Sequence, residues 1–183
     1  MTFPATLRGF IERRDHRLMR RVHRWRPPRW FRLWMIYATR AGDGWLWYAL
    51  SLVILIDGGH ERFAALGAAG TACLTGVILF VILKKLAGRT RPNKLEPHCW
   101  ATVLPPDEFS FPSGHTITAF AFALAVGGFY PLALGVLLFC AFSIATSRIM
   151  LGMHFLSDVI AGALLGAGLG YASYTMLLQL SSR

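Results

Sequence analysis

Residues 63–83 read FAALGAAGTACLTGVILFVIL and contain no charged side chain. A helix needs about 20 consecutive apolar residues to cross the hydrocarbon core of a bilayer, and this run has that length. It ends at Lys84 and Lys85, whose ammonium groups are costly to bury and therefore indicate the edge of the membrane. The stretch predicts a transmembrane helix, and its neighbours extend that prediction to the whole chain.

The composition is that of a membrane protein. Of the 183 residues, 55% are hydrophobic and only 15% are charged, whereas about a quarter of a typical soluble domain is charged. Further apolar segments follow the same pattern, at residues 30–39, 45–56, 116–130, 132–146 and 154–178. They predict an all-α, polytopic bundle of about six transmembrane helices. The first two segments are shorter than a full span, so the sequence leaves open whether residues 30–56 cross twice.

Residues 1–29 differ from the rest of the chain because they are strongly basic. They hold nine arginines, at positions 8, 13, 14, 17, 20, 21, 24, 26 and 29, against Glu12 and Asp15. Apolar residues recur between the arginines at helical spacing, which predicts an amphipathic helix that lies in the membrane interface and binds anionic head groups. A basic arm can also bind nucleic acid, but the apolar segments behind it argue against that partner. We therefore divide the chain into an interfacial helix, 1–29, and one membrane-embedded domain, 30–183.

The basic start also predicts the orientation of the chain. With six spans both termini lie on the same side, and the positive-inside rule assigns that side to the cytoplasm. The polar loop 86–112 and the connection 147–154 then share the opposite face. We expect a bacterial inner-membrane protein whose functional residues face the periplasm. The sequence gives no indication of its oligomeric state.

Glycines in the last apolar segment indicate close helix packing. Gly162, Gly166 and Gly170 are spaced by four residues and share one helical face. Small residues at this spacing let two helix backbones approach each other in lipid. We therefore expect this face to contact another helix closely.

The polar residues outside the basic arm form three clusters, each at the outward end of a predicted helix. The clusters are Lys84 with Arg91-Pro92, then Pro112-Ser113-Gly114-His115, then Ser147-Arg148 with His154 and Asp158. The predicted topology brings these helix ends to one face. We expect a single site where the three clusters meet.

The third cluster has the residues of a nucleophilic centre. His154 and Asp158 are four residues apart at the start of a helix, which places them on one face. The carboxylate can accept a hydrogen bond from one imidazole nitrogen and leave the other nitrogen to attack. Arg148 precedes them across Gly152, where the chain can bend, and its guanidinium can bind two phosphate oxygens.

The second cluster has the features of an anion site. Ser113 and Gly114 precede the first turn of a helix, where backbone amides and the helix dipole favour a phosphate. His115 stands beside that position and can protonate a departing alkoxide.

Three cations supply the positive charge that phosphate chemistry needs. Lys84, Arg91 and Arg148 can neutralise a phosphoryl group in transfer, a task that magnesium often performs. The sequence contains no carboxylate cluster or HExxH motif that would hold a metal. We therefore expect a metal-free site that uses no cofactor.

Together the clusters resemble the signature of the type 2 phosphatidic acid phosphatase superfamily, K-x6-RP, PSGH and SR-x5-H-x3-D, at every position. The resemblance implies a six-helix membrane protein with its site at the outer leaflet. It implies that His154 is the nucleophile and forms a phosphohistidine, that Asp158 orients it and that His115 is the general acid. The phosphate ligands that it implies are Lys84, Arg91, Ser113, Gly114 and Arg148.

The resemblance implies a lipid phosphate as substrate and leaves the lipid open. Small bacterial members act on undecaprenyl pyrophosphate, phosphatidylglycerol phosphate, phosphatidic acid or lipid A phosphates, and the first two are favoured here. Two alternatives remain: a phosphotransferase that passes the phosphate to an acceptor lipid, and a non-catalytic lipid-binding protein. Arg40 and Asp43 also approach the outward face, where a structural ion pair is the preferred interpretation.

Overall fold

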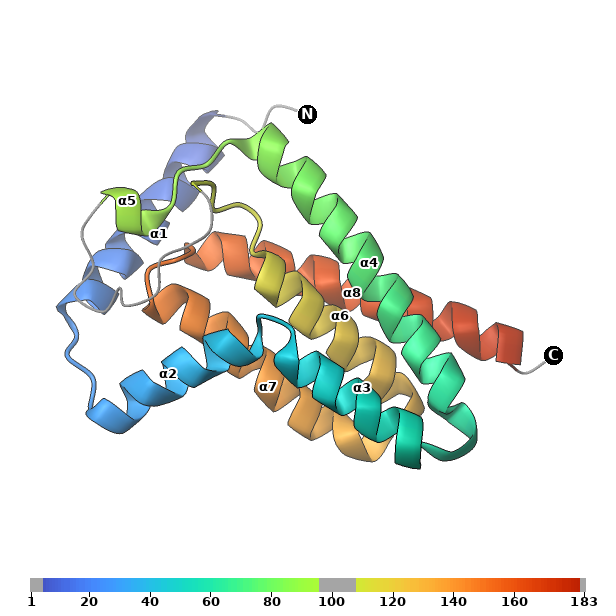
Figure 1. The fold of residues 1–183 in the computed structure, drawn as a ribbon. Coiled ribbons are helices and arrows are strands. Elements are labelled where there is room, and N and C mark those ends of the chain that lie inside the picture. Colours follow the sequence, from blue (N-terminus) through green and yellow to red (C-terminus); the bar gives the residue numbers. More distant parts are fainter. Residues whose placement is uncertain (1–4, 96–107, 182–183) are drawn as a thin grey trace.

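The computed structural model describes residues 5–95 and 108–181, which are almost entirely helical (Figure 1). Its elements are α1 (Ala5–Arg24), α2 (Arg29–Ala41), α3 (Trp45–Asp57), η1 (Gly59–Glu61), α4 (Arg62–Ala87), α5 (Pro92–Leu95), α6 (Gly114–Phe129), α7 (Pro131–Met150) and α8 (Leu156–Ser181). In the described chain, the β-type pairing consists of one isolated bridge between Thr90 and Phe109. The predicted all-α class is confirmed.

Local sequence explains where the long helices begin and end. Pro131 occupies the first turn of α7, where its missing N–H costs nothing. Gly88 ends α4 with a φ of +54°, and its amide donates to the carbonyl of Lys84. Pro27 and Pro28 stand between α1 and α2 and separate the basic helix from the bundle.

Helix α6 lies at the centre of the bundle, between α4, α7 and α8 (Figure 1). Alanines 119, 121, 123 and 125 of α6 are fully buried. The outer faces of α4, α7 and α8 instead expose large apolar side chains such as Leu74, Leu132 and Leu164. An apolar exterior around a packed core fits a bundle that is surrounded by lipid.

Three segments are long and apolar enough to cross a membrane: Gly59–Ala87, Pro131–Met150 and Leu156–Leu180. Trp45–Asp57 and Gly114–Phe129 are apolar but shorter. Membrane-spanning helices are therefore confirmed, whereas the expected number of six is not.

The glycine face of α8 packs against the backbone of α6, as predicted. A Cβ atom added at Gly162 would lie 2.8 Å from the carbonyl oxygen of Ser113, and one at Gly170 would lie 2.5 Å from that of Ala121. A Cβ atom added at Gly166, between them, would also meet the backbone of α6. This close approach carries the start of α8 to the start of α6, so it brings the second and third clusters together.

Helix α1 lies across the end of the bundle where α4 ends and α8 begins (Figure 1). The Asp15 carboxylate accepts hydrogen bonds from the amide (3.2 Å) and the hydroxyl (2.5 Å) of Ser157. His16 contacts the ring of Phe155 edge-on, with centroids 5.1 Å apart. The basic helix is therefore part of the end that carries the signature residues.

Helix α2 stays in the same half of the molecule. It packs against α7, with Phe31 near Leu151 at one end and Gly42 against His115 at the other. Both of its ends lie near signature residues, at Leu151 and at His115, so its 13 residues do not carry the chain to the other end of the bundle. Helix α3 is the first to carry the chain to the opposite end of the bundle. At that end the hydroxyl of Tyr130 donates to the carbonyl of Gly58, which follows α3.

This path corrects the predicted topology. Helices α3, α4, α6, α7 and α8 run between the two ends of the bundle, so α1 and the last turn of α8 lie at opposite ends (Figure 1). The sequence predicts both termini on one side and the basic helix on the face opposite to the signature residues. Both expectations depended on α2 crossing the membrane, and α2 is instead a short helix that crosses over α7.

Candidate active site

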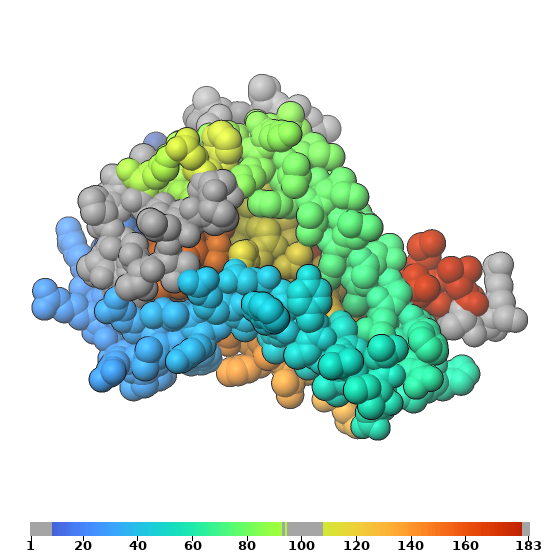
Figure 2. Space-filling view, in the orientation of Figure 1, coloured from blue at the N-terminus to red at the C-terminus, as the bar shows by residue number. Residues whose placement is uncertain are grey.

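A pocket of about 320 Å³ opens at the end of the bundle where the three clusters meet. Figure 2 shows α6, in yellow, at the bottom of a hollow between α4, in green, and the α2–α3 region, in blue. The predicted site residues that line the pocket are Arg91, Gly114, His115, Arg148 and His154. The structure therefore brings residues from all three clusters to one cavity.

His154 lies in the turn between α7 and α8 and is only 2% exposed. Gly152 shapes this turn with a φ of +67°, a conformation that favours glycine. Nδ1 of His154 lies 2.6 Å from the carbonyl oxygen of Ser110. Because a carbonyl can only accept, Nδ1 carries the proton, and Nε2 keeps its lone pair for the pocket.

Arg91 donates to that lone pair. Its Nη1 lies 3.0 Å from Nε2 of His154 and 2.9 Å from the carbonyl oxygen of Met153. The arginine is 2% exposed, so its charge acts in a medium that screens it weakly. The guanidinium is thus held where it can bind a phosphate that is attacked by His154.

A short pairing of two chain segments positions Arg91 and Ser110 together. Thr90 and Phe109 form the antiparallel bridge described above. The bridge therefore brings their neighbours Arg91 and Ser110 to His154 together, one at each ring nitrogen. Ser110 was missed by the sequence analysis, since its contribution is a backbone carbonyl that no residue type signals.

Asp158 is fully buried, but its position differs from the one expected. Oδ2 lies 3.9 Å from Nδ1 of His154 and accepts a hydrogen bond from the amide of Phe155 at 2.8 Å. Oδ1 accepts from Nη1 of Arg89 at 2.6 Å. Ser110 rather than Asp158 accepts the imidazole proton, because a carboxylate in the first turn of a helix is drawn to the amides that lack an intrahelical partner.

Arg148 is buried at the end of α7 and lines the pocket opposite α4. Its Nη1 donates to Oγ1 of Thr39 at 2.6 Å. Thr39 is fully enclosed near the end of α2, so this short helix helps to hold a predicted phosphate ligand. Thr39 was not identified from the sequence, where it is one polar residue in an apolar segment.

His115 is paired with Asp43, from the turn between α2 and α3. Nε2 of His115 lies 2.8 Å from Oδ1 of Asp43. The expected ion pair of Asp43 with Arg40 is also present, at 3.6 Å. Gly42 allows the close approach, since a Cβ there would lie 3.0 Å from Cδ2 of His115. Asp43 is therefore both a structural partner of Arg40 and a partner of the predicted general acid.

Lys84 and Ser113 are predicted phosphate ligands that lie outside the pocket lining. Nζ of Lys84 lies 4.9 Å from the centre of the Phe80 ring, and Phe80 lines the pocket. The Ser113 hydroxyl accepts from Oγ1 of Thr116, and its amide donates to the carbonyl of Asp158. Lys84 thus contacts Phe80 of the pocket wall, and Ser113 joins the starts of α6 and α8.

The electrostatic environment of His154 keeps its imidazole neutral. Burial, together with the positive charges of Arg148 and Arg91, holds the pKa of His154 well below its usual range. The hydrogen bond to the Ser110 carbonyl acts in the opposite direction and is outweighed. A neutral imidazole with an available Nε2 is the form that a nucleophile requires.

Within residues 5–95 and 108–181, no three His, Cys, Asp or Glu side chains lie close enough to hold a metal ion. The charged and titratable side chains that do line the pocket are Asp43, Arg91, His115, Arg148 and His154. Two arginines that line one pocket make it suited to an anion with several oxygens.

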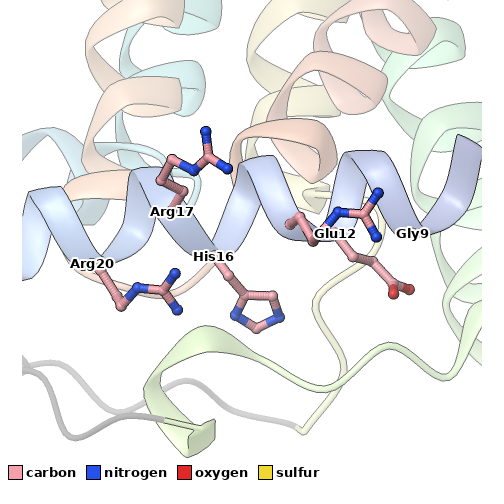
Figure 3. Close-up of a pocket in the computed structure, with 6 residues that line it drawn as sticks. Gly9, Glu12, His16, Arg17 and Arg20 are labelled. Atoms are coloured by element: carbon pink, nitrogen blue, oxygen red, sulfur yellow. The ribbon is translucent and has the colours of Figure 1, made fainter.

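A second pocket, of about 450 Å³, lies along α1 (Figure 3). It is lined by Gly9, Glu12, Arg13, His16, Arg17 and Arg20. It shares no lining residue with the first pocket and includes none of the predicted site residues. Its arginines are exposed, as expected for the polar face of an interfacial helix.

Comparison with known proteins identifies the family of the chain. The model of the PAP2 superfamily matches residues 64–181. The chain belongs to this superfamily. It is 35% identical over 127 residues to decaprenylphosphoryl-5-phosphoribose phosphatase of Mycobacterium tuberculosis, which is 69% of this chain and 68% of that protein. Its membrane relatives are lipid phosphatases, and the resemblance to the type 2 phosphatidic acid phosphatase superfamily is confirmed.

Other members of the superfamily extend the comparison. Lipid A 1-phosphatase of Rhizobium johnstonii is 35% identical over 94 residues, or 49% of this chain and 38% of that protein. The crystal structure of Aquifex aeolicus LpxE superposes with a TM-score of 0.72 at 27% identity and covers 87% of this chain and 93% of its own. The phosphatidylglycerolphosphate phosphatase of Bacillus subtilis shares the fold, with a TM-score of 0.69 at 22% identity over 91% of this chain and 85% of its own.

Proposed function

We propose that this PAP2 protein hydrolyses a phosphomonoester or pyrophosphate of a lipid through a phosphohistidine at His154. The observation that carries the proposal is the geometry of that imidazole. Its Nδ1 proton is held by the Ser110 carbonyl, while Nε2 faces Arg91 in a pocket lined by two arginines and a second histidine. A merely structural histidine has no need of a depressed pKa and an anion pocket at its lone pair.

The proposed reaction has two steps. In the first, Nε2 of His154 attacks phosphorus, the bond from phosphorus to the lipid oxygen breaks, and His115 gives its proton to that oxygen. In the second, His115 takes a proton from water, the water oxygen attacks the phosphohistidine, and phosphate leaves as Nε2 regains its lone pair. Arg91 and Arg148 bind the phosphoryl oxygens throughout, with the first-turn amides of α6.

Asp43 fits the role of a partner for the general acid. The Asp43 carboxylate, hydrogen-bonded to Nε2 of His115, favours the protonated imidazole that the first step requires, against burial and the charge of Arg148, which disfavour it. Asp158 lies 3.9 Å from Nδ1 of His154 and can balance the positive charge that develops on that ring as the phosphohistidine forms.

We propose that the reaction needs no metal ion. Arg91 and Arg148 line the pocket, and Lys84 adds a third positive charge next to Phe80 of its wall. These cations and the start of α6 can supply the charge that magnesium supplies in other phosphoryl transfers. Full activity in excess EDTA is the expected result, and activity restored only by an added divalent cation would contradict it.

The relatives narrow the substrate class that we propose. Two of their names refer to polyprenyl carriers, decaprenylphosphoryl-5-phosphoribose phosphatase and undecaprenyl-diphosphatase, and one refers to lipid A. A pocket of about 320 Å³ can hold a phosphate and a small head group, with Val77 and Phe80 of α4 forming an apolar wall. A polyprenyl-linked phosphate is therefore the favoured class, with undecaprenyl pyrophosphate as one member and phosphatidylglycerol phosphate as the main competitor.

The decisive experiment is phosphate release by the purified protein in detergent with EDTA. The panel contains polyprenylphosphoryl-5-phosphoribose, undecaprenyl pyrophosphate, phosphatidylglycerol phosphate, phosphatidic acid and lipid A. We expect release from one or two lipids, loss of release in His154→Ala, and full release in His60→Ala, a control at an exposed histidine of η1. Release that survives His154→Ala would overturn the proposed nucleophile.

Two other functions are tested by the same preparation. A phosphotransferase would form a new phosphorylated lipid when an acceptor lipid is added, and thin-layer analysis of the products would reveal it. A non-catalytic binding protein would bind the lipids but release no phosphate from any of them. The two histidines that line the pocket favour hydrolysis or transfer over binding alone.

We also propose that the pocket opens on the cytoplasmic side of a bacterial inner membrane. Six arginines of α1 are exposed at the end of the bundle that carries the pocket. At the opposite end of the bundle, Arg62 is the one lysine or arginine among the described residues. Asp57 and Glu61 lie close to it in sequence. The positive-inside rule places the arginine-rich end in the cytoplasm.

This orientation is the reverse of the one that the family resemblance implied, and fusions can separate them. Alkaline phosphatase fused after residue 183 should be active, because the end of α8 would lie in the periplasm, and a fluorescent protein fused there should stay dark. The opposite pair of results would place the pocket on the outer face. Exposed arginines of α1 should also strengthen binding to vesicles that contain anionic lipids, relative to neutral vesicles.

A further inference from the structure

Helix α1 carries a buried carboxylate in the middle of its basic sequence. Asp15 is only 5% exposed, whereas the arginines on either side of it, Arg14 and Arg17, are exposed. An interfacial helix that only rests on the membrane needs an apolar inner face and gains nothing from a buried charge. The position of Asp15 therefore points to a specific partner inside the protein.

That partner is Arg89, which joins Asp15 to the active site. Nη2 of Arg89 donates to Oδ2 of Asp15 at 2.7 Å, and Nη1 donates to Oδ1 of Asp158 at 2.6 Å. The hydroxyl of Ser157 is hydrogen-bonded to both Arg89 (2.7 Å) and Asp15 (2.5 Å). The guanidinium also stacks over the ring of Phe155, 4.2 Å from its centroid. Arg89 is thus fixed from several directions.

Two carboxylates therefore share one guanidinium. Asp15 offsets the charge of Arg89, so that Asp158 keeps a net negative field toward His154, 3.9 Å away. Without the Asp15 carboxylate, Arg89 would neutralise Asp158 alone and draw it away from the imidazole. Asp158 would then balance the charge of a phosphohistidine less well.

We propose that Asp15 is a positioning residue for the reaction, acting through Arg89 and Ser157 to hold Asp158 beside His154. This inference rests on the proposed function, because it assigns Asp15 a part in catalysis at His154. It makes α1 an integral part of the active site, although α1 contributes none of the signature residues. Arg89, which lies between Lys84 and Arg91, becomes a positioning residue as well.

The first test compares Asp15→Asn with the wild-type protein and with Glu12→Gln. The control makes the same carboxylate-to-amide change three residues earlier on the same helix. We expect Asp15→Asn to lower kcat by about 10- to 100-fold and leave KM within about twofold, because the binding arginines remain in place. Glu12→Gln should keep wild-type kinetics, and Asp15→Glu should recover part of the lost kcat.

A double-variant cycle separates positioning from a merely structural role. If Asp15 acts through Asp158, then Asp15→Asn should have little further effect on kcat in an Asp158→Asn background. A helix that only stabilises the fold would give the same loss of kcat in both backgrounds, and that additive result would overturn the proposal. Ser157→Ala provides a milder variant should Asp15→Asn prove too unstable to purify, and it should show the same dependence on Asp158.

The failure of this inference is distinguishable from failure of the proposed function. A wild-type protein that releases no phosphate from the lipid panel would remove the function itself. A wild-type protein that is active, loses activity in His154→Ala and retains full kcat in Asp15→Asn would leave the function intact. That second outcome would overturn the role of Asp15 alone.

Discussion

Nη1 of Arg91 lies 3.0 Å from Nε2 of His154, on the side from which a phosphorus atom must approach the nucleophile. The resting contact therefore holds the phosphate-binding cation at the place where the phosphate will be attacked. A bound phosphate would take over the N–H of Arg91 and expose the lone pair of His154 to phosphorus. The arginine keeps its second contact, with the carbonyl of Met153, as an anchor.

Arg91→Lys should lower kcat/KM by about 10- to 100-fold. Lysine keeps the charge but cannot bind the Met153 carbonyl and two phosphoryl oxygens with a planar fork. Steady-state kinetics on the preferred lipid, with Arg62→Lys as the control at the other end of the bundle, measures the effect. Wild-type kinetics in Arg91→Lys would show that the site needs charge there and not the fork.

The acid limb of the pH profile should lie below the usual histidine range. The nucleophile reacts as neutral imidazole, and the pKa of His154 is held down by burial and by Arg148 and Arg91. Activity should therefore persist as the pH falls through about 6.5, the ordinary histidine pKa, and decline only at lower pH. Arg91→Gln removes one of the two cations, so the acid limb of that variant should move to higher pH.

A profile of kcat/KM against pH for the wild type and Arg91→Gln tests this expectation. Equal acid limbs in the two proteins would contradict an electrostatic cause. A wild-type limb centred at or above about 6.5 would contradict the neutral resting state of His154.

Asp43→Asn should slow the reaction mainly for substrates with poor leaving groups. The variant weakens the support of His115 as an acid, so a lipid alkoxide should leave about tenfold more slowly. An aryl phosphate such as p-nitrophenyl phosphate needs little protonation and should be affected much less. A loss of equal size on both substrates would indicate a damaged pocket rather than a weakened acid.

Two glycines of α8 offer a matched test of helix packing. Gly166→Ala should destabilise the protein by about 1–3 kcal/mol, because the new methyl group meets the backbone of α6 at Ile117. Gly168 has no heavy atom within 4 Å of an added Cβ, so Gly168→Ala should be neutral or stabilise by up to about 1 kcal/mol. Thermal unfolding in detergent distinguishes the two, and equal stability of both variants would refute the close α6–α8 contact.

Sequence periodicity and composition were enough to predict an all-helical membrane protein and the three helix ends that meet. A long apolar run has few alternatives to a buried or lipid-facing helix, so the sequence alone predicts α4, α7 and α8. The spacing of Gly162, Gly166 and Gly170 predicted the close packing that aligns α6 with α8. The signature residues came together because each cluster lies at or next to the end of a bundle helix.

The tertiary structure decided the features that depend on contacts between distant short segments. The 13 residues of α2 do not indicate whether the helix crosses the membrane. Counting it as one membrane crossing too many placed the basic helix on the face opposite to the pocket, whereas in the structure the two share one end of the bundle. The partners of the signature residues, such as Ser110 for His154, Asp43 for His115 and Arg89 for Asp158, lie in turns and loops. Hydrophobic periodicity reports which face of a helix is buried, but a hydrogen bond between two segments depends on how the whole bundle packs.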